Sequence, residues 1–158
     1  MKYDICAIGN ALVDTQYMVE HDFLEEIGLV ADSMTLTSSE EQSPIVQKLK
    51  EMNVESVSDC GGSATNSLVA ASNYGSICHH VCRVSDDEDG HKYLDSLKVA
   101  GVEHIGFSKE ECDLPTGKCL IFVTPDAKRT MSSMLGISAF LGPLDINLDA
   151  IRNSKIFY

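Results

Sequence analysis

The chain has 158 residues, a formal net charge of −12 from 12 basic and 24 acidic side chains, and 44% hydrophobic residues. This length and composition are those of one globular domain with an ordinary apolar core. The acidic balance argues against nucleic acids and anionic membranes as partners, because both attract basic patches.

The N-terminal stretch MKYDICAIGNAL, residues 1–12, places charges inside a short apolar run and therefore lacks the core of a signal peptide. The sequence contains no run of about 18 apolar residues that could cross a membrane. We therefore expect a cytoplasmic protein that binds neither membranes nor nucleic acids.

The first predicted elements are a strand and a short helix. The stretch YDICAIG, residues 3–9, is an apolar run that ends at a glycine, which is typical of a buried strand. HDFLEEIG, residues 21–28, has an acidic first turn and a glycine stop, which predicts a helix that ends at Gly28.

A longer helix is predicted from SSEEQSPIVQKLKEM, residues 38–52. A serine followed three residues later by a glutamate, Ser38 and Glu41, is the pattern of a helix N-terminus. Pro44 fits only in the first turn of this helix. Its predicted apolar stripe is Ile45, Val46, Leu49 and Met52.

A glycine pair, Gly61 and Gly62, then precedes further alternating elements. The helix after the pair has a face of small residues suited to packing on a sheet, namely Leu68, Val69, Ala71 and Ser72. The next elements are a strand at 76–84 (SICHHVCRV), a helix at 87–101 (DEDGHKYLDSLKVAG) and a strand at 102–107 (VEHIGF). Strands alternating with helices predict an α/β fold with a mainly parallel sheet flanked by helices.

Two further segments and a hairpin depart from this alternation. TQYMV, residues 15–19, and SMTLT, residues 33–37, alternate polar and apolar side chains without a full crossover helix. GKCLIFVTPDAKRTMSSM, residues 117–134, predicts a hairpin that turns at Pro125–Asp126. Together these segments predict a small side sheet over the edge of the main sheet.

The cysteines do not indicate a disulfide framework or a metal site. They are Cys6, Cys60, Cys78, Cys82, Cys112 and Cys119. Their spacing lacks the regularity of a secreted scaffold, so we expect reduced thiols. In CHHVC, residues 78–82, an extended strand separates the two cysteines by roughly 13 Å, too far for one zinc ion without a sharp bend. We expect an ordinary buried or half-buried strand there.

Two turns are the candidate ligand positions. Ligands of open α/β sheets lie beyond the carboxyl ends of strands. Residues 10–14 follow the first strand, and residues 59–66 follow the short run VESVS. A glycine pair before a helix lets backbone approach a ligand, and the free N–H groups of the first turn can bind hydroxyl or phosphate oxygens. A different α/β protein whose glycine turn binds a phosphate is the alternative at this point.

Blocks of the sequence resemble the ribokinase-like, phosphofructokinase-B-type carbohydrate kinases in order and spacing. They are GNALVD (9–14), GGSATN (61–66), RVSDDEDGHKYLDSLKVAGV (83–102) and PTGKCLIFVTPDAKRTM (115–131). The resemblance spans essentially the whole chain. It implies phosphorylation of a sugar or nucleoside hydroxyl with ATP and Mg²⁺, and a large α/β domain with a β-sheet lid. The lid would comprise residues 15–19, 33–37 and parts of 117–134, and a homodimer could form through it.

The resemblance also implies roles for residues in the two candidate turns. Asp14 looks like the carboxylate that accepts hydrogen bonds from sugar hydroxyls, with Asn10 beside it. Gly61, Gly62 and Asn66 look like the turn and side chain that contact a ribose-like ring. An ionised carboxylate and an amide can fix vicinal hydroxyls in this way.

Within the family, the motifs are most similar to those of adenosine kinases. The matching positions are Asn10, Leu12, Asp14, Ser63, Asn66, Thr116, Gly117 and Cys119. All but Thr116 and Gly117 belong to the predicted substrate site. On this resemblance, Met34, Leu36 and Cys119 line an apolar slot for the base, and Arg129 lies near the phosphate path.

Each assignment has a purely structural alternative. Asp14 could cap a turn, and Asn66 could be an ordinary residue of a helix start. Arg129 could be a solvated hairpin residue, and Met34 and Leu36 could belong to the core.

The sequence also lacks a part that the resemblance would require. The Gly-Ala-Gly-Asp turn that supplies the family's catalytic base does not occur, and SKIFY, residues 154–158, looks like the opening of another buried strand. We therefore expect the N-terminal, substrate-binding half of an adenosine-kinase-like enzyme, with the catalytic base and the ATP site outside these residues. The alternatives are a ribokinase- or fructokinase-like sugar kinase and a non-catalytic module that binds a sugar or nucleoside.

Overall fold

The first part of the structure is a four-stranded parallel sheet with the order β6-β5-β1-β9. The computed structural model describes residues 1–107 and 113–158. The strands of this sheet are β1 (Tyr3–Ile8), β5 (Cys78–Val81), β6 (Val102–His104) and β9 (Ser154–Phe157). The first predicted strand thus lies inside the sheet, between β5 and β9.

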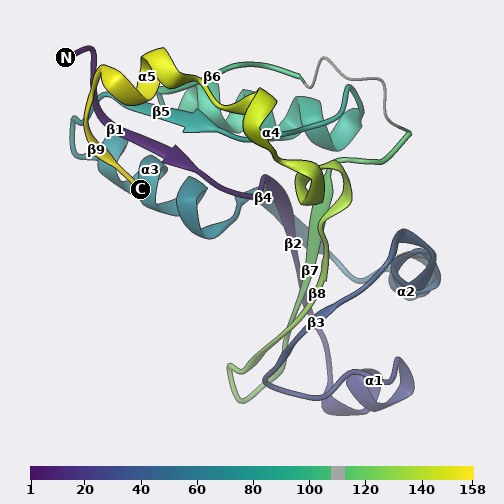
Figure 1. Ribbon diagram of the computed structural model, residues 1–158. Helices are drawn as coiled ribbons and strands as arrows, with labels where there is room; N and C mark the ends of the chain where they lie inside the picture. The colour runs from purple at the N-terminus through teal and green to yellow at the C-terminus, as the bar shows by residue number, and fades with distance from the viewer. Residues whose placement is uncertain (108–112) are drawn as a thin grey trace.

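Helices cover both faces of this sheet (Figure 1). They are α3 (Ser63–Asn73), α4 (Glu88–Val99) and α5 (Leu148–Arg152), with the 3-10 helices η1 (Gly136–Phe140) and η2 (Pro143–Asp145) before α5. On one face, Leu68 of α3 and Tyr93 of α4 are buried in the same apolar cluster as Ala7 of β1. On the other face, Ala150 of α5 is buried with Cys6 of β1. Each large apolar side chain buried in this way contributes about 1.5–3 kcal/mol to stability.

The second part is a five-stranded mixed sheet with the order β3-β8-β7-β2-β4. Its strands are β2 (Leu12–Met18), β3 (Met34–Leu36), β4 (Ser56–Gly61), β7 (Gly117–Val123) and β8 (Arg129–Met134). β7 and β8 form the predicted antiparallel hairpin, β2 runs parallel to β7, and β4 runs antiparallel to β2. The central strand of this sheet is therefore β7.

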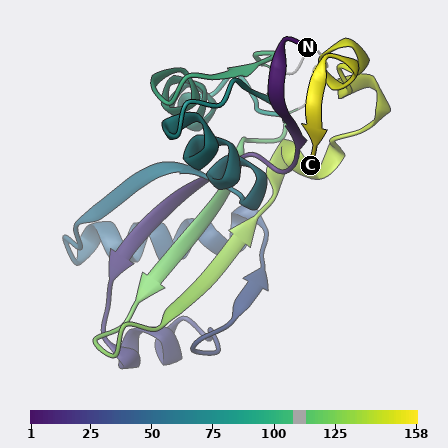
Figure 2. The same ribbon diagram turned by 90° about the vertical axis from the view of Figure 1, so that its left-hand side faces the viewer.

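Helices α1 (His21–Glu26) and α2 (Ser39–Glu51) lie on one face of the second sheet and leave the other face open (Figures 1 and 2). On the helix side, Phe23, Leu49 and Phe122 belong to a second apolar cluster. The start of α2 has the expected reciprocal cap, since the Glu41 N–H donates to Ser38 Oγ at 3.2 Å and the Ser38 N–H to Glu41 Oε2 at 2.6 Å.

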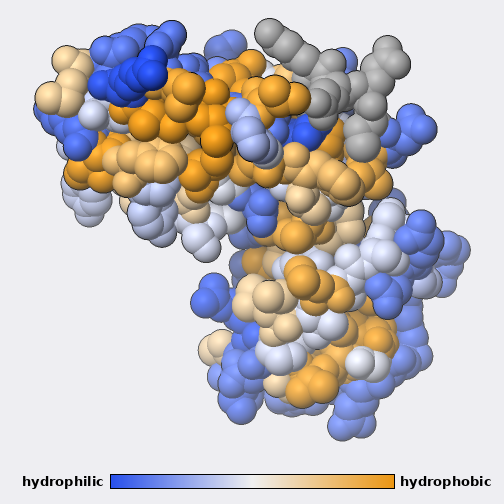
Figure 3. Space-filling view, in the orientation of Figure 1, coloured by the Kyte–Doolittle hydropathy of each residue, from blue (hydrophilic) through white to orange (hydrophobic). Residues whose placement is uncertain are grey.

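The two parts meet at a concave corner (Figure 3). The open face of the second sheet forms one side of this corner, and the part that contains α3 forms the other (Figures 1 and 3). The predicted α/β fold with a parallel sheet, flanking helices and a second sheet is confirmed. Among the described residues, however, the second sheet is not the small one that was predicted, because it has five strands and the parallel sheet has four.

Several local predictions were wrong. Pro44 lies inside α2 beyond its first turn, because the reciprocal cap starts the helix at Ser39, five residues earlier in the chain. Met52 is 53% exposed and does not continue the apolar stripe. Residues 12–14 belong to β2 rather than to a loop after the first strand, because they pair with both β4 and β7. The final segment is a strand, as predicted, but an edge strand with exposed side chains from Lys155 onward.

The predicted strand at CHHVC is confirmed, since residues 78–81 form β5. The five described cysteines are free thiols, and Cys112 lies outside the described residues. Residues 78–81 form strand β5 and Cys82 is buried, and residues 1–107 and 113–158 contain no cluster that could hold a metal ion. Within the same residues, no helix is long and apolar enough to cross a membrane.

Candidate functional site

Asp14 and Gly61 form the centre of the candidate site, where the second sheet joins the first part of the protein. A Cβ atom built on Gly61 would lie 2.1 Å from Asp14 Cγ, so the carboxyl group occupies the space over the glycine. Asp14 lies within β2 and caps no turn. A side chain at position 61 would therefore displace the carboxylate.

The loop between β1 and β2 lies against the glycine turn. Gly62 has a φ of +101°, and a Cβ atom on it would lie 2.4 Å from the Asn10 carbonyl oxygen, so both the backbone conformation and the space require glycine. The buried Ser138 Oγ accepts a hydrogen bond from the Ala11 N–H at 2.8 Å and donates to Asn10 Oδ1 at 3.4 Å. Gly62 and Ser138, which come from two distant segments, thus fix the position of Asn10.

Helix α3 begins directly at this turn. Gly62 is its N-cap residue and makes no side-chain cap, so the first-turn N–H groups depend on other partners. Ser63 and Asn66 in this first turn have exposed side chains. The Asn66 N–H already donates to the Gly62 carbonyl at 2.9 Å, so Asn66 offers its side-chain amide to a ligand.

One row of side chains crosses the open face of the second sheet. From β3 to β4, it consists of Leu36, Ser133, Cys119, Asp14 and Asp59. Three strand spacings separate its apolar end from Asp14, roughly 14 Å. Inside the row, Ser133 Oγ donates to Cys119 Sγ at 3.3 Å. The structure therefore aligns the predicted carboxylate with two of the predicted base-slot residues in one row, in which Leu36 is exposed and Cys119 is buried.

The other predicted residues lie at different depths of the same face. Met34 pairs with Met131 in the next row, and Met34 and Leu36 are 56% and 62% exposed, so they do not belong to the core. Leu12 pairs with Gly61 and is half-buried. Arg129 begins β8 four residues before Ser133, roughly 13 Å away, so the structure does not bring it to Asp14.

The electrostatics of the site follow from its burial and from a pair of carboxylates. Partial burial raises the pKa of Asp14, and the Asp59 carboxylate directly opposite raises it further. Burial also raises the pKa of Cys119, to which the Asp14 charge adds, and burial raises the pKa of Cys60 to about 11. These thiols are therefore protonated at neutral pH. A carboxylate accepts hydrogen bonds, so a ligand hydroxyl is a suitable donor to Asp14.

Sequence reasoning placed Asp59 at the start of a candidate turn but not opposite Asp14, and it missed Ser138 and Ser133. Ser133 could have been found, because it lies two residues from Met131 in the predicted hairpin and period-two alternation places both on one face. Ser138 and the pairing of Asp59 with Asp14 gave no such signal, since the partners come from segments far away in the chain.

The fold and the site define a class of protein. It is an α/β protein with a parallel sheet, joined at a glycine turn to a mixed sheet whose open face presents a carboxylate beside a helix N-terminus. The chain belongs to the pfkB family of carbohydrate kinases, whose family model matches residues 23–158.

The chain is also similar to individual proteins of known structure or sequence. The adenosine kinase from Sinorhizobium meliloti is 31% identical with a TM-score of 0.85, and the match covers 100% of this chain and 47% of that chain. A probable sugar kinase from Rhizobium etli CFN 42 is 27% identical with a TM-score of 0.84, covering 99% of this chain and 46% of that one. Fructokinase-2 of Solanum lycopersicum is 33% identical over 102 residues, which are 62% of this chain and 30% of the relative. The chain thus spans about half the length of these solved structures.

Proposed function

We propose that the protein takes part in ATP-dependent phosphorylation of a nucleoside hydroxyl, with adenosine as the substrate and these residues as the substrate-binding half. The observation that carries the proposal is the row from Leu36 to Asp14 on the open face of the second sheet. One end of this row is apolar and the other ends in a carboxylate next to a helix N-terminus. A nucleoside has the same polarity, with a flat apolar base and a ribose that carries hydroxyl donors.

In this proposal, the second sheet is a lid over the substrate. Asp14 accepts hydrogen bonds from the ribose hydroxyls, while Asn10, Asn66 and the turn at Gly61 and Gly62 contact the ring. Leu12 and Ser63 border the same pocket. Met34, Leu36 and Cys119 line the slot for the base. Arg129 lies roughly 13 Å from Ser133 along β8 and is left out of this pocket.

The family resemblance adds ATP and Mg²⁺ as co-substrate and metal. Among residues 1–107 and 113–158, no group of three or more His, Cys, Asp or Glu side chains could hold a metal ion. We therefore assign these residues no step in the handling of Mg²⁺ or ATP. The residues described above bind and orient the sugar hydroxyls, and a catalytic base is not among them.

A sugar kinase of the fructokinase type is the second candidate, because several similar curated proteins are fructokinases at 29–36% identity. A bare hexose would leave the Met34, Leu36 and Cys119 surface unfilled, which favours the nucleoside. A non-catalytic module that binds a nucleoside is the alternative outside the enzymes. A cytoplasmic location and a homodimer through the lid stay predictions.

The proposal is tested with the protein as its gene encodes it. Calorimetric titration should show that adenosine binds more tightly than fructose or ribose, and a coupled assay should show ATP-dependent phosphorylation with the same preference. Asp14→Asn and Asn66→Ala should each weaken adenosine binding by roughly 1.5–3 kcal/mol with little change in thermal stability. Preference for a simple sugar would support the second candidate, and binding without phosphorylation would support the module.

A further inference from the structure

A polar belt separates two apolar cores on the helix-covered face of the second sheet. Along β2, Val13 belongs to the first core and Tyr17 to the second, and Thr15 between them bonds to Ser58 Oγ at 3.0 Å. On the α2 side, the buried Gln42 donates to the Ser132 carbonyl at 2.8 Å. The two cores are therefore separated along the second sheet. The first core includes Val13 of β2, and Cys60 of β4 packs against it, so both apolar packing and polar contacts join the two parts of the protein.

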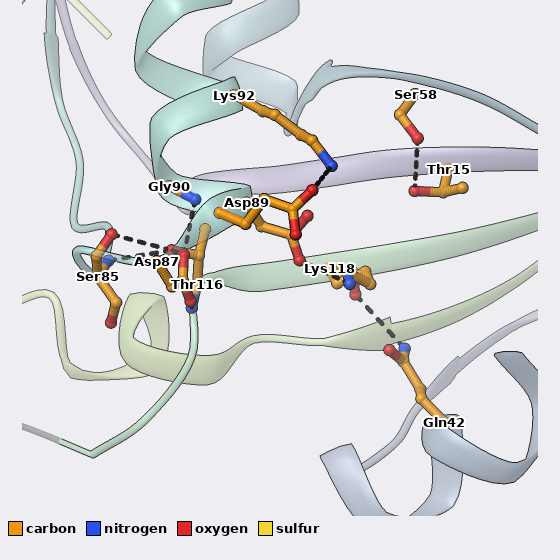
Figure 4. Close-up of polar contacts among 11 residues, drawn as sticks. Thr15, Gln42, Ser58, Ser85, Asp87, Asp89, Gly90, Lys92, Thr116 and Lys118 are labelled. Atoms are coloured by element: carbon orange, nitrogen blue, oxygen red, sulfur yellow. Dashed lines mark hydrogen bonds and ion pairs between the residues drawn. The ribbon is translucent and has the colours of Figure 1, made fainter. Parts of the chain in front are cut away.

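The first turn of α4 holds the start of β7 at two points, which Figure 4 shows together. Asp87 accepts hydrogen bonds from the Thr116 N–H at 2.8 Å and from Thr116 Oγ1 at 2.7 Å, and Thr116 is fully buried. Two residues further along both elements, Asp89 Oδ2 accepts from Lys118 Nζ at 2.6 Å, and the two side chains are 24% and 29% exposed. One attachment is thus buried, and the other is an ion pair that water and salt can reach.

The Asp89–Lys118 ion pair joins a helix of the first part to a strand of the second. Other ion pairs among the described residues stay within one part, as Lys92–Glu88 does within α4 and Lys48–Glu26 does between the helices beside the second sheet. Lys118 pairs with Val13 of β2, and the next residue of β7 pairs with Asp14. Lys118 therefore lies on β7, the strand next to β2, one residue before the residue that pairs with Asp14.

We propose that Asp89 and Lys118 are positioning residues for the substrate site, which hold β7, and with it Asp14, at a fixed angle to α3. The inference rests on the proposed function and names what sets the geometry of that site. When the ion pair is lost, the buried Asp87–Thr116 contacts remain and act as a pivot. The second sheet then tilts about Thr116. As a result, Asp14 and the N-terminus of α3 can no longer bind the same ligand together.

The test compares variants of the protein as its gene encodes it. Asp89→Asn and Lys118→Met remove the ion pair, and Asp89→Lys combined with Lys118→Asp restores it in reverse. Glu88→Gln is the matched control, because it removes one charge from the same turn of α4 and breaks a pair that stays within the helix. The measurements are the adenosine Kd by calorimetry, KM and kcat, and hydrogen exchange of residues 12–18 and 117–123 without ligand.

We expect Asp89→Asn and Lys118→Met each to raise the adenosine Kd and KM about fivefold, the scale of a partly exposed ion pair, with kcat changed less than twofold. Hydrogen exchange of both segments should become faster. The charge reversal should return the Kd to within about twofold of the original. Salt at 1 M should reproduce the loss in the unsubstituted protein, because it screens exposed charges.

A Kd and exchange rate that stay unchanged in Asp89→Asn would overturn the inference, as would an equal effect of Glu88→Gln or a charge reversal that restores nothing. If the unsubstituted protein binds no adenosine, the proposed function is wrong. Hydrogen exchange then still decides whether the ion pair holds β7 and β2, because that measurement needs no ligand.

Discussion

Replacing Gly61 with alanine should prevent Asp14 from binding the substrate, although Asp14 itself is not substituted. A Cβ atom at position 61 would lie 2.1 Å from Asp14 Cγ and 2.2 and 2.3 Å from its two oxygens, far inside van der Waals contact. Gly61 is not among the glycines with positive φ, so alanine can adopt its backbone conformation. The side chain of Asp14 therefore moves while the strand pairing of β2 and β4 remains.

The size of the effect follows from what the carboxylate would lose. Hydrogen bonds to a charged group contribute about 1.5–3 kcal/mol, so the adenosine Kd should rise roughly 10- to 160-fold. Stability should change little, because a displaced rotamer costs about 0.5–1.5 kcal/mol and replacing glycine lowers the entropy of the unfolded chain by an opposing 0.4–1 kcal/mol.

Calorimetric titration of adenosine into Gly61→Ala, Asp14→Asn and the double variant measures this coupling. The double variant should bind no more weakly than Asp14→Asn, because both changes remove the same interaction. Gly142→Ala is the control, since the contact nearest to a Cβ there is 3.6 Å. A Kd for Gly61→Ala within twofold of the original, or losses that add in the double variant, would refute the reasoning.

Three further outcomes are expected. Burial lowers the pKa of His80 to about 4, so the unfolded chain binds a proton at His80 more readily than the folded chain below pH 6.5. The free energy of unfolding by urea should therefore fall by about 2 kcal/mol between pH 7 and pH 5. An equal fall in the His80→Gln variant would contradict this origin. Asp87→Ala should lower the free energy of unfolding by about 2–4 kcal/mol, because it removes a helix cap and leaves the buried Thr116 N–H without its acceptor. The Asp86→Ala change at an exposed residue should be neutral. A chain of residues 1–158 should self-associate along β9 and show no ATP-dependent phosphorylation; a monodisperse monomer in light scattering, or measurable turnover, would show that the corresponding part of this expectation is wrong.

Local patterns predicted the elements whose cause is local. The reciprocal cap at Ser38 and Glu41 needs residues three apart, and the hairpin of β7 and β8 needs a short turn at Pro125–Asp126. Both were readable in the sequence for that reason. Pro44 was placed wrongly because the cap and the apolar face of α2 outweigh one missing hydrogen bond.

Strand pairing between distant segments was not readable in this way. Alternation shows which side chains share a face of β2, but it does not show that β4 runs antiparallel beside it and places Asp59 opposite Asp14. The same limit hid Ser138, which meets Ala11 across 127 positions of sequence. The resemblance to a kinase family supplied residues for the site, and the structure supplied the row that connects them.

The place of β1 inside its sheet has a consequence for synthesis of the protein. Asp4 of β1 and Lys155 of β9 form a 2.6 Å ion pair across 151 positions of sequence. At about 5–20 residues per second, a ribosome makes these two partners roughly 8–30 s apart. During that interval, one edge of β1 has no strand beside it while β5 and β6 can already pair. Such high contact order slows folding, so the nascent chain should depend on chaperones more than a helical protein of equal length.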